Sequence, residues 1–382
     1  MFKQLLADLG VHQTQLLQLL QPLPAGDCYT QYHTDLSPLA WHLGHCVYTE
    51  LYWVQEVVSG NTTIDDALKS LYIPELSAKA VRGQSLPPHA ELIDWAATEQ
   101  ARCREQLATL NWDKPQQRLL QDHYLLHFLS QHYAQHIETT RLILIQRALN
   151  TADKKPATPL TAQALKRDTA QIPAGEYTIG YTGNGFHYDN EAPAFTTQLQ
   201  AYDIATDVVS HGEYLGFVLD GGYVNSALWT NDGWQWCQQQ AIQAPMHWQQ
   251  DKAGDWCAIA LFPDETISDS DALFGISRHE AAAFARWAGA RLPHEYEWET
   301  ACRNNKLTDA GQCWEWCDNT FHPYAGFSAY PYDGYSLPWF DGEHYVLRGH
   351  SRHSMDCVKR PSFRNYYAPD KRHIHAGLRL CL

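Results

Sequence analysis

Gln131-His132-Tyr133-Ala134-Gln135-His136-Ile137-Glu138 is the stretch of this 382-residue chain that says most about its fold. His132 and His136 are four residues apart, so on a helix both imidazoles project from one face, about one turn apart. A second stretch, Trp41-His42-Leu43-Gly44-His45, also carries histidines in a helical pattern. A third imidazole from this neighbouring helix would complete a three-histidine site with open positions for substrate, which favours a catalytic metal over a structural one.

Residues 1–152 have the apolar periodicity of helices and are expected to form one domain. Apolar side chains recur at helical spacing over residues 2–21, 37–58, 89–110 and 121–149. Ser37 is expected to cap the second helix, with Pro38 at its first helical position. Four helices with these connections predict a four-helix bundle, whose interior commonly houses metal sites.

A polar, proline-containing stretch over residues 153–170 is expected to link this bundle to a second domain at residues 171–382. In the second domain short apolar runs alternate with Gly, Pro, Asn and Asp, and one clear helix is expected at 279–289, where a glycine ends it. The 14 tryptophans and 21 tyrosines suit a core built from large rings. The expected fold class is α+β with two domains.

The composition narrows the choice of partners. A formal net charge of −15 argues against a nucleic acid or an anionic membrane as partner, which leaves small-molecule substrates. No apolar run approaches membrane-spanning length, and an acidic N-terminus is unlike a signal peptide, so a cytoplasmic location is expected. The ten cysteines are expected to be mostly reduced, and Cys313 and Cys317 lack the second pair that a zinc site needs.

The 20 histidines also produce pairs by chance. His123 and His127 form another pair four residues apart on the same predicted helix, turned by about 140° from the first pair. His42 and His45 compete in the same way on the other helix. Spacing alone therefore leaves open which histidines face the interior, and it does not choose between zinc and iron.

The two histidine stretches, followed by a series of later motifs, resemble the ergothioneine-type sulfoxide synthases. The histidine stretches match the metal-binding signatures of that family, and the second domain resembles the formylglycine-generating-enzyme domain that these proteins carry. The matching stretches of the second domain are 172–180, 189–193, 288–299, 313–316, 346–349, 361–366 and 376–379. The resemblance implies a DinB-like four-helix bundle followed by a formylglycine-generating-enzyme/C-type-lectin-like domain.

The resemblance also implies a metal and a reaction. In the family pattern His45, His132 and His136 hold a non-haem Fe(II), and O2 is a co-substrate. The reaction joins a thiol or selenol to C2 of the imidazole of hercynine. Three neutral ligands leave the positive charge of the ion to be balanced by a bound thiolate or selenolate.

Further site residues follow from the same resemblance. Gln135 matches a glutamine that hydrogen-bonds the imidazole of hercynine, the substrate that accepts the sulfur or selenium. Asn365 and Tyr366 match positions beside its quaternary ammonium, where an aromatic face provides a cation–π contact worth about 0.5–2 kcal/mol. Arg82 lies where the family places an arginine that holds the carboxylate of the sulfur donor. The proton-donating tyrosine of the family corresponds to one of Tyr324, Tyr330, Tyr332 and Tyr335, and the sequence does not single one out.

The donor-binding pattern departs from the branch that uses γ-glutamylcysteine. That branch has an Asp and a basic clamp where this chain has Tyr367 and Lys371. This chain therefore has fewer groups that could bind a zwitterionic thiol. Tyr367 cannot replace the carboxylate that would pair with the ammonium of the donor, and Lys371 cannot form the bidentate hydrogen bonds of a guanidinium. Gly349-His350-Ser351-Arg352-His353 is a second departure, and it brings two imidazoles near the presumed cleft. The stretches most similar to the selenoneine synthase branch, whose donor is a selenosugar, are 71–75, 79, 82–83 and 336–340.

Three alternatives to a selenoneine synthase using a selenosugar or thiosugar stay open. The nearest is an ergothioneine or ovothiol sulfoxide synthase with γ-glutamylcysteine or cysteine as donor. A second is the oxidation of a protein cysteine to formylglycine, which would need Cys313 and Cys317 as a reactive pair. The third is a non-catalytic, lectin-like binding protein, which predicts no bound metal.

Overall fold

The computed structural model describes residues 1–61, 64–114, 116–150, 157–166, 168–260 and 266–382. They separate into two compact units, each described by itself below. The helical unit comprises Met1–Ala152 and Ser354–Val358, and the second unit comprises Asp153–His353 and Lys359–Leu382. Of the linker expected at 153–170, residues 153–156 and 167 lie outside the described residues, and part of the rest forms strands of the second unit.

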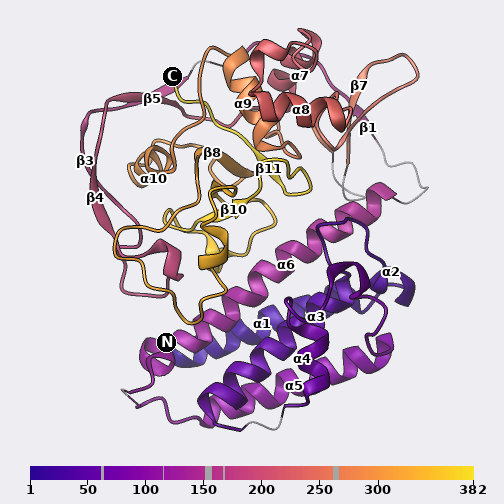
Figure 1. The fold of residues 1–382 in the computed structure, drawn as a ribbon, viewed down its shortest axis with the longest axis vertical. Helices are drawn as coiled ribbons and strands as arrows, with labels where there is room; N and C mark the ends of the chain where they lie inside the picture. The colour runs from indigo at the N-terminus through magenta and orange to yellow at the C-terminus, as the bar shows by residue number, and fades with distance from the viewer. Residues whose placement is uncertain (62–63, 115, 151–156, 167, 261–265) are drawn as a thin grey trace. The chain divides into compact units, whose positions relative to one another are not determined.

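The helical unit confirms the helical fold expected for the N-terminal domain (Figure 1). Its long helices are α1 (Phe2–Leu20), α3 (Leu39–Leu51), α5 (His89–Thr109) and α6 (Tyr124–Asn150), which pack against one another. The shorter helices are α2 (Ala25–Tyr29) and α4 (Asp66–Tyr72), with 3-10 turns at Lys79–Val81 and Arg118–His123. The buried face of α1 includes Leu9, Leu16 and Leu20, which follow the helical repeat.

The helix expected over residues 37–58 differs from the expectation at both ends. α3 begins at Leu39 and has no side-chain cap. The hydroxyl of Ser37 is used elsewhere, because it accepts a hydrogen bond from Nη1 of Arg82 at 2.7 Å. At its C-terminal end α3 continues as a π-helix over Tyr52–Val58. The predicted helix therefore exists, but it begins two residues later than expected, and its last seven residues form the wider π-helix.

A buried polar network joins the four long helices. The fully buried carboxylate of Glu50 accepts hydrogen bonds from Nε2 of Gln13 at 2.7 and 2.8 Å and from the Tyr133 hydroxyl at 2.8 Å. Gln100 donates to the same hydroxyl at 3.2 Å. Burial raises the pKa of Glu50 to about 7. Because Tyr133 follows His132 directly, this network also sets the rotation of α6 about its own axis.

The second unit is a mixed α+β domain made of short strands. One sheet has the order β10 (Asn365–Tyr367), β9 (Tyr345–Gly349), β8 (Trp314–Thr320) and β11 (Ala376–Gly377). A second has the order β1 (Ala157–Pro159), β7 (Trp256–Ile259) and β6 (Trp248–Gln250). Two further pairs are β2 (Thr169–Ile172) with β5 (Tyr202–Ala205), and β3 (Gly175–Ile179) with β4 (Phe195–Leu199). Only β11 with β8 is parallel among the pairs in the described residues.

The expectation of one clear helix in this domain is wrong. The described part contains α7 (His211–Leu219), α8 (Asn231–Gln239), α9 (Arg278–Trp287) and α10 (Glu295–Arg303), of which α9 is the predicted one. The other three have nine residues each, too few for a helical period to stand out. A local signal was present, since Ser210 and Glu213 form a capping box at the start of α7.

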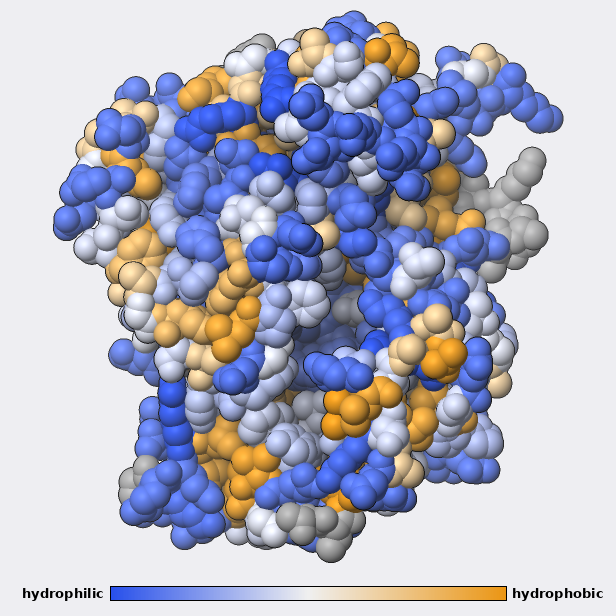
Figure 2. Space-filling model, viewed as in Figure 1, coloured by the Kyte–Doolittle hydropathy of each residue, from blue (hydrophilic) through white to orange (hydrophobic). Residues whose placement is uncertain are grey.

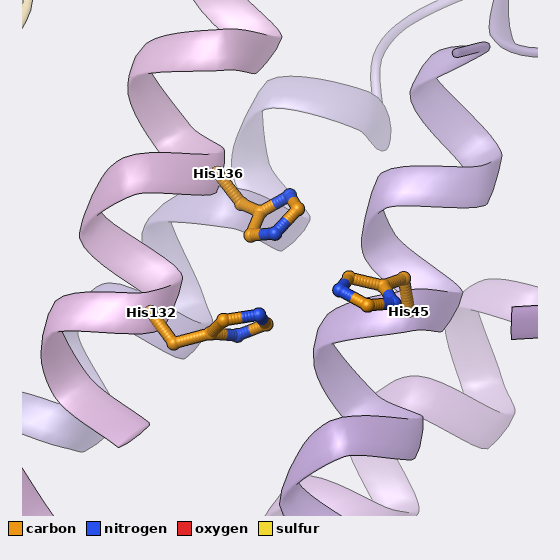
Figure 3. Close-up of side chains that lie close together, drawn as sticks. All are labelled: His45, His132 and His136. Carbon is orange, nitrogen blue, oxygen red and sulfur yellow. The ribbon is translucent and has the colours of Figure 1, made fainter. Parts of the chain in front are cut away.

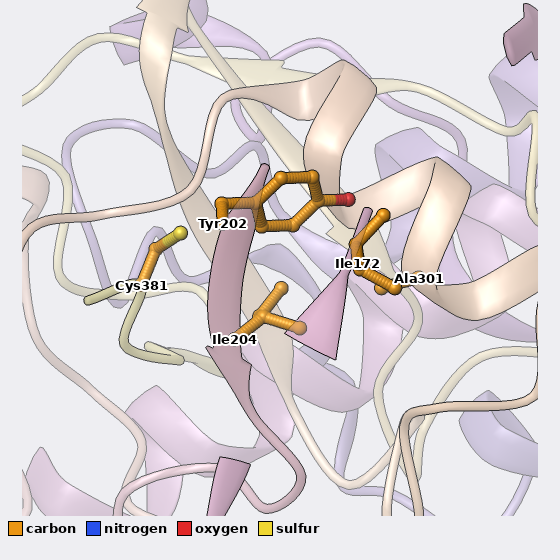
Figure 4. Packing of buried hydrophobic residues seen from close by; sticks show 5 residues of the cluster. All are labelled: Ile172, Tyr202, Ile204, Ala301 and Cys381. Carbon is orange, nitrogen blue, oxygen red and sulfur yellow. The ribbon is translucent and has the colours of Figure 1, made fainter. Parts of the chain in front are cut away.

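Large rings and buried ion pairs hold the second unit together. One cluster of buried side chains joins β2, β5, α10 and the C-terminal end (Figure 4), and it consists of Ile172, Tyr202, Ile204, Ala301 and Cys381. Beside α10, Nη2 of the fully buried Arg348 lies 2.9 Å from Glu295 and 2.8 Å from Glu299. Arg364 also pairs with Glu295, at 2.8 Å. Burial acts to raise the pKa of Glu295, but these two guanidinium groups outweigh that effect and lower the pKa to about 2.

The surface drawn in Figure 2 is mainly hydrophilic, with hydrophobic residues in small groups. Within the described ranges, every helix is too short or too polar to span a bilayer. Exposed large side chains of the second unit include Tyr332, Leu337 and Trp339, which are 41, 45 and 40% exposed. Tyr332 is one of the candidate tyrosines, and Leu337 and Trp339 follow Tyr335 by two and four residues.

Candidate metal centre

Three histidine side chains from two helices converge inside the helical unit. His132 and His136 project from α6 towards His45 on α3 (Figure 3). One ring nitrogen of each lies within 4.8 Å of those of the other two. The ring centroids are 5.2, 4.9 and 4.5 Å apart. One ion between them would be within reach of all three imidazoles.

The competing pair of histidines is placed differently. His123 lies in the 3-10 turn that precedes α6, and its ring packs against Phe2 and Trp112 at centroid distances of 5.4 and 5.1 Å. His127 is on α6 but outside the three-histidine cluster. In the structure, therefore, His132 and His136 converge with His45 whereas His123 and His127 do not, and the role of the three as metal ligands stays a prediction.

Hydrogen bonds on the outer side of the cluster orient two of its imidazoles. Nδ1 of His45 lies 2.7 Å from the carbonyl oxygen of Tyr72. Because a carbonyl only accepts, this nitrogen carries the proton, and Nε2 keeps its lone pair. Nδ1 of His136 is hydrogen-bonded to Nδ1 of His42 at 2.8 Å, which leaves Nε2 of His136 available to a metal ion. His42 thus contacts the cluster through His136 and is not one of its three members.

The chemistry of the cluster fits a divalent transition metal. Removal from water lowers the pKa of His45 to about 4 and lowers the pKa values of His132 and His136 well below the ordinary value. All three rings are therefore neutral near pH 7 and can offer lone pairs. Nδ1 of His132 is buried and, among the described residues, has no hydrogen-bond partner, which costs about 1–3 kcal/mol unless a ligand occupies the site. Three neutral imidazoles suit Fe(II) or Zn(II).

Trp41 and Arg82 support the cluster from the side of α3. The Trp41 ring stacks on His45 with a centroid distance of 4.8 Å and an interplanar angle of 10°. The guanidinium of Arg82 lies 4.0 Å from the centroid of the Trp41 ring. It also donates to the Ser37 hydroxyl at 2.7 Å and to the Pro74 carbonyl at 2.8 Å. These contacts lie within the helical unit, and a role of Arg82 towards the donor carboxylate stays a prediction.

Gly44 permits the close approach of α3 to Tyr72, whose carbonyl orients His45. A Cβ atom at Gly44 would lie 2.1 Å from Cε1 of Tyr72, and that ring is fully buried and stacked on Trp95. Alanine in a helix usually stabilises by about 0.5–1 kcal/mol relative to glycine, but here the clash dominates. We expect Gly44→Ala to lower the free energy of unfolding by about 1–3 kcal/mol, as measured by urea denaturation, and to weaken metal binding.

Gly10→Ala on α1 is the matched control for this substitution. A Cβ atom at Gly10 would meet the side chain of Arg104 at 3.4 Å, which is ordinary contact. This variant should be neutral or slightly stabilising. A Gly44→Ala variant as stable as the Gly10→Ala variant would contradict the packing argument.

The other predicted residue of the helical unit is Gln135. It precedes His136 on α6 and is half-buried, with Nε2 3.5 Å from the Gln131 carbonyl. Helix geometry turns the Gln135 side chain by about 100° from that of His136. Its hydrogen bond to the imidazole of the acceptor stays a prediction.

The predicted residues of the second unit share a short strand. Asn365, Tyr366 and Tyr367 form β10 and are half-buried. The Tyr366 ring stacks on Phe321 with a centroid distance of 4.1 Å, and its hydroxyl donates to the Tyr335 carbonyl at 2.7 Å. These contacts fix the orientation of the ring. The role of the strand in binding a quaternary ammonium stays a prediction.

Of the two positions that differ from the donor-binding pattern, Tyr367 is the last residue of this strand and Lys371 follows it by four residues. The Tyr367 ring meets His373 edge-on at 5.9 Å between centroids. Nζ of Lys371 lies 3.5 Å from a carboxylate oxygen of Asp370. A side chain that already faces a neighbouring carboxylate offers a weaker clamp for a second one.

The four candidate tyrosines have different surroundings. Tyr324 is buried, and its hydroxyl accepts a hydrogen bond from Arg348 at 3.0 Å. Burial raises its pKa well above the ordinary value. Tyr330 and Tyr335 are half-buried, and Tyr332 is 41% exposed. Tyr324 is therefore part of the buried ion-pair cluster, and the identity of the catalytic tyrosine stays a prediction.

Cys313 and Cys317 do not have the surroundings of a reactive pair. Both are fully buried, and burial raises the pKa of each thiol above its usual range. Cys317 lies on β8 and Cys313 directly precedes it. Residues four apart along a strand are separated by roughly 13 Å, too far for the two sulfurs to act together. This geometry argues against formylglycine formation at these cysteines.

Comparisons with known proteins agree with both domains. The model of the sulfatase-modifying factor enzyme 1-like domain matches residues 155–309 and 307–382, and that of the DinB superfamily matches residues 9–140. The chain is 28% identical over 433 residues to the hercynine oxygenase of Mycobacterium tuberculosis (strain ATCC 25618 / H37Rv), covering 99% of this chain and 98% of the relative. The hercynine oxygenase of Mycolicibacterium smegmatis is 27% identical over 440 residues, with the same coverage.

A shorter match is confined to part of the chain. The formylglycine-generating enzyme of Bos taurus is 31% identical over 199 residues, which cover 44% of this chain and 53% of that protein. The two full-length relatives named above are hercynine oxygenases, and the narrower resemblance to the selenoneine synthase branch gains no support from them. Similarity over the full length to these oxygenases identifies the chain as an enzyme. The chain belongs to the sulfatase-modifying factor enzyme 1-like family, with a DinB-type helical domain preceding the family domain.

Proposed function

We propose that this enzyme is a non-haem Fe(II) sulfoxide synthase that uses O2 to join a thiol to C2 of the imidazole of hercynine. The observation that carries the proposal is the cluster of three neutral imidazoles at His45, His132 and His136, in a chain similar over 99% of its length to a hercynine oxygenase. The two hercynine oxygenases named above support this ergothioneine-type reaction, with a thiol as donor, better than a reaction with a selenosugar.

The proposed reaction balances without an external reductant. The thiol S–H and the imidazole C2–H bonds break, and a C–S bond and an S=O bond form. One oxygen atom of O2 ends on sulfur, and the other leaves as water with the two hydrogens. When bound, Fe(II) supplies the redox chemistry that couples the reduction of O2 to the oxidation of both organic substrates.

The residues of the chain hold and orient the reactants. The three uncharged ligands leave the positive charge of a divalent ion uncompensated, which favours binding of the donor as its thiolate. The Gln135 amide, one residue before a ligand histidine, hydrogen-bonds the imidazole of hercynine. Asn365 and the oriented ring of Tyr366 contact its trimethylammonium group. Holding both substrates in attack geometry accounts for much of the rate enhancement.

The identity of the sulfur donor is the most detailed part of the proposal. Tyr367 and Lys371 stand where a carboxylate and a bidentate base would hold γ-glutamylcysteine, and the Arg82 guanidinium already donates within its own unit. A thiol with fewer charges than γ-glutamylcysteine therefore fits these positions better. Cysteine has one carboxylate fewer than γ-glutamylcysteine but is still a zwitterion, so an uncharged thiosugar fits these positions better, and a selenosugar is a related donor.

Turnover with a panel of donors tests the proposal. The protein is reconstituted anaerobically with Fe(II), mixed with hercynine and O2, and offered γ-glutamylcysteine, cysteine, a thiosugar or a selenosugar, with products identified by mass spectrometry. We expect a C–S product from at least one thiol, with one O2 consumed per product. Turnover of the selenosugar alone would favour the selenoneine branch. One equivalent of iron without product from any donor would contradict the substrates, and no bound iron would contradict the metal centre.

A further inference from the structure

Glu138 ends the second histidine signature, yet it takes no part in the metal cluster. It follows His136 by two residues on α6, so helix geometry turns it about 200° away from that ligand. The cluster of possible ligand atoms in this part of the described chain contains only the three histidines. The side chain is nevertheless only 9% exposed. A buried carboxylate requires partners to offset its lost hydration.

The structure gives Glu138 such partners. The Ser354 hydroxyl donates to Oε2 of Glu138 at 2.6 Å, and Ser354 is itself only 5% exposed. Arg141, three residues further along α6, interacts electrostatically with the same carboxylate. A hydrogen bond to a charged acceptor at this distance is of the short, strong kind.

Ser354 belongs to a segment that leaves the second unit. The chain is part of that unit up to His353 and again from Lys359, but Ser354–Val358 belongs to the helical unit. The segment ends in a 3-10 turn over Asp356–Val358, and Val358 is buried. The two units are therefore joined by the chain at three points along the sequence: 152–153, 353–354 and 358–359.

This segment lies within the connection between two paired strands. β9 precedes it and β10 follows it, and the two strands pair antiparallel with Asn365 opposite Leu347. Asn365 is seven residues after Val358, so the chain allows at most roughly 25 Å between them. The segment fixed on α6 is therefore separated from β10 by only six residues of chain.

We propose that Glu138 is a positioning residue, which anchors Ser354–Val358 on α6 and thereby restrains β10 with Asn365 and Tyr366. The anchor itself follows from contacts within the helical unit, whereas its effect on hercynine rests on the proposed function. The signature glutamate thus serves the site through the chain that carries the acceptor-binding strand. Its side chain neither binds the metal nor contacts the substrate.

Two substitutions and a control test the anchor. Ser354→Ala removes the donor, and Glu138→Gln keeps the shape and one acceptor oxygen while removing the charge. We expect Ser354→Ala to raise KM for hercynine roughly tenfold with little change in kcat, and Glu138→Gln to have a smaller effect, because a hydrogen bond to a charged group is lost or weakened. Glu138→Gln should add little when Ser354 is already alanine.

Asp27→Asn is the matched control. It removes another carboxylate that anchors α6, since Asp27 accepts from Arg147 at 2.9 and 2.6 Å, but it leaves the Ser354–Val358 segment untouched. We expect KM for hercynine to be unchanged in this variant. A variant that merely folds less well would lose kcat in proportion to its folded fraction and keep its KM.

Hydrogen exchange and iron content separate the anchor from the proposed reaction. The amides of residues 354–358 should exchange at least tenfold faster in Ser354→Ala than in the unaltered protein or Asp27→Asn, while iron stays at one equivalent in every variant. Loss of iron in Glu138→Gln, unchanged exchange, or unchanged KM despite faster exchange would each overturn the proposal. If the unaltered protein does not turn over hercynine, the proposed function fails, and exchange alone decides the anchor.

Discussion

His132→Ala is expected to abolish both Fe(II) binding and turnover. The change removes one of three imidazoles whose ring nitrogens lie within 4.8 Å of one another, and the described residues near the site offer no other carboxylate or thiol in that cluster. Two histidines on separate helices hold a divalent ion far more weakly than three. Anaerobic reconstitution followed by metal analysis should give less than a tenth of an equivalent of iron, and product formation should fall by at least 10³-fold.

His127→Gln provides the control for this experiment. His127 lies on the same helix, outside the three-histidine cluster, and forms no part of the proposed substrate contacts. The variant should bind one equivalent of iron and retain turnover. Circular dichroism on both variants verifies that α6 is intact. Full activity in His132→Ala would show that the reaction does not depend on this cluster.

The long helices of the first domain could be predicted because their apolar faces repeat over several turns. α1 and α5 begin and end within one or two residues of the expectation. In the second domain α7, α8 and α10 were missed, since nine residues give a period too little length to emerge from a background rich in aromatic residues. Its strands are as short as two residues, and their pairing depends on partners distant in sequence.

The metal centre could be predicted only in part from spacing. The four-residue interval of His132 and His136 is a local property of a helix, so it could predict the two members of the cluster that lie on α6. The choice between His42 and His45 depends on contacts that no interval encodes. Nδ1 of His45 donates to the carbonyl of Tyr72, 27 residues further on, whereas His42 bonds His136 from α3. Family resemblance, rather than spacing, supplied His45.

The residues proposed to bind hercynine could not be found from sequence patterns, for a similar reason. Asn365 and Tyr366 lie on a three-residue strand whose position depends on its pairing with β9 and on the buried Arg364 that precedes it. The glutamate of the second signature is the converse case. Its place in a histidine motif suggests a metal ligand. Helix geometry turns Glu138 away from the histidines, however, and its carboxylate accepts a hydrogen bond from Ser354.

The affinity for Fe(II) is expected to be nearly independent of pH between 7.5 and 5.5, changing by less than about threefold. A metal competes with protons only below the pKa of its histidine ligands. Desolvation lowers the pKa of His45 to about 4 and lowers those of His132 and His136 well below the ordinary value. All three ligands therefore stay neutral throughout this range. Ligands with an ordinary pKa near 6.5 would each be about 90% protonated at pH 5.5, and the affinity would fall about 10³-fold.

An anaerobic competition titration at each pH measures this dependence, with a short histidine peptide as the control for ordinary pKa values. Folding must be followed in parallel, because a histidine whose pKa is lowered in the folded state stabilises the fold above pH 6.5 and loses that contribution as the pH falls towards its folded pKa. The metal-free protein should therefore lose stability below pH 6.5, while the protein that remains folded keeps its affinity. A fall in affinity of a hundredfold or more by pH 5.5, without unfolding, would show that the imidazoles are hydrated and that the cluster is not the closed site its geometry indicates.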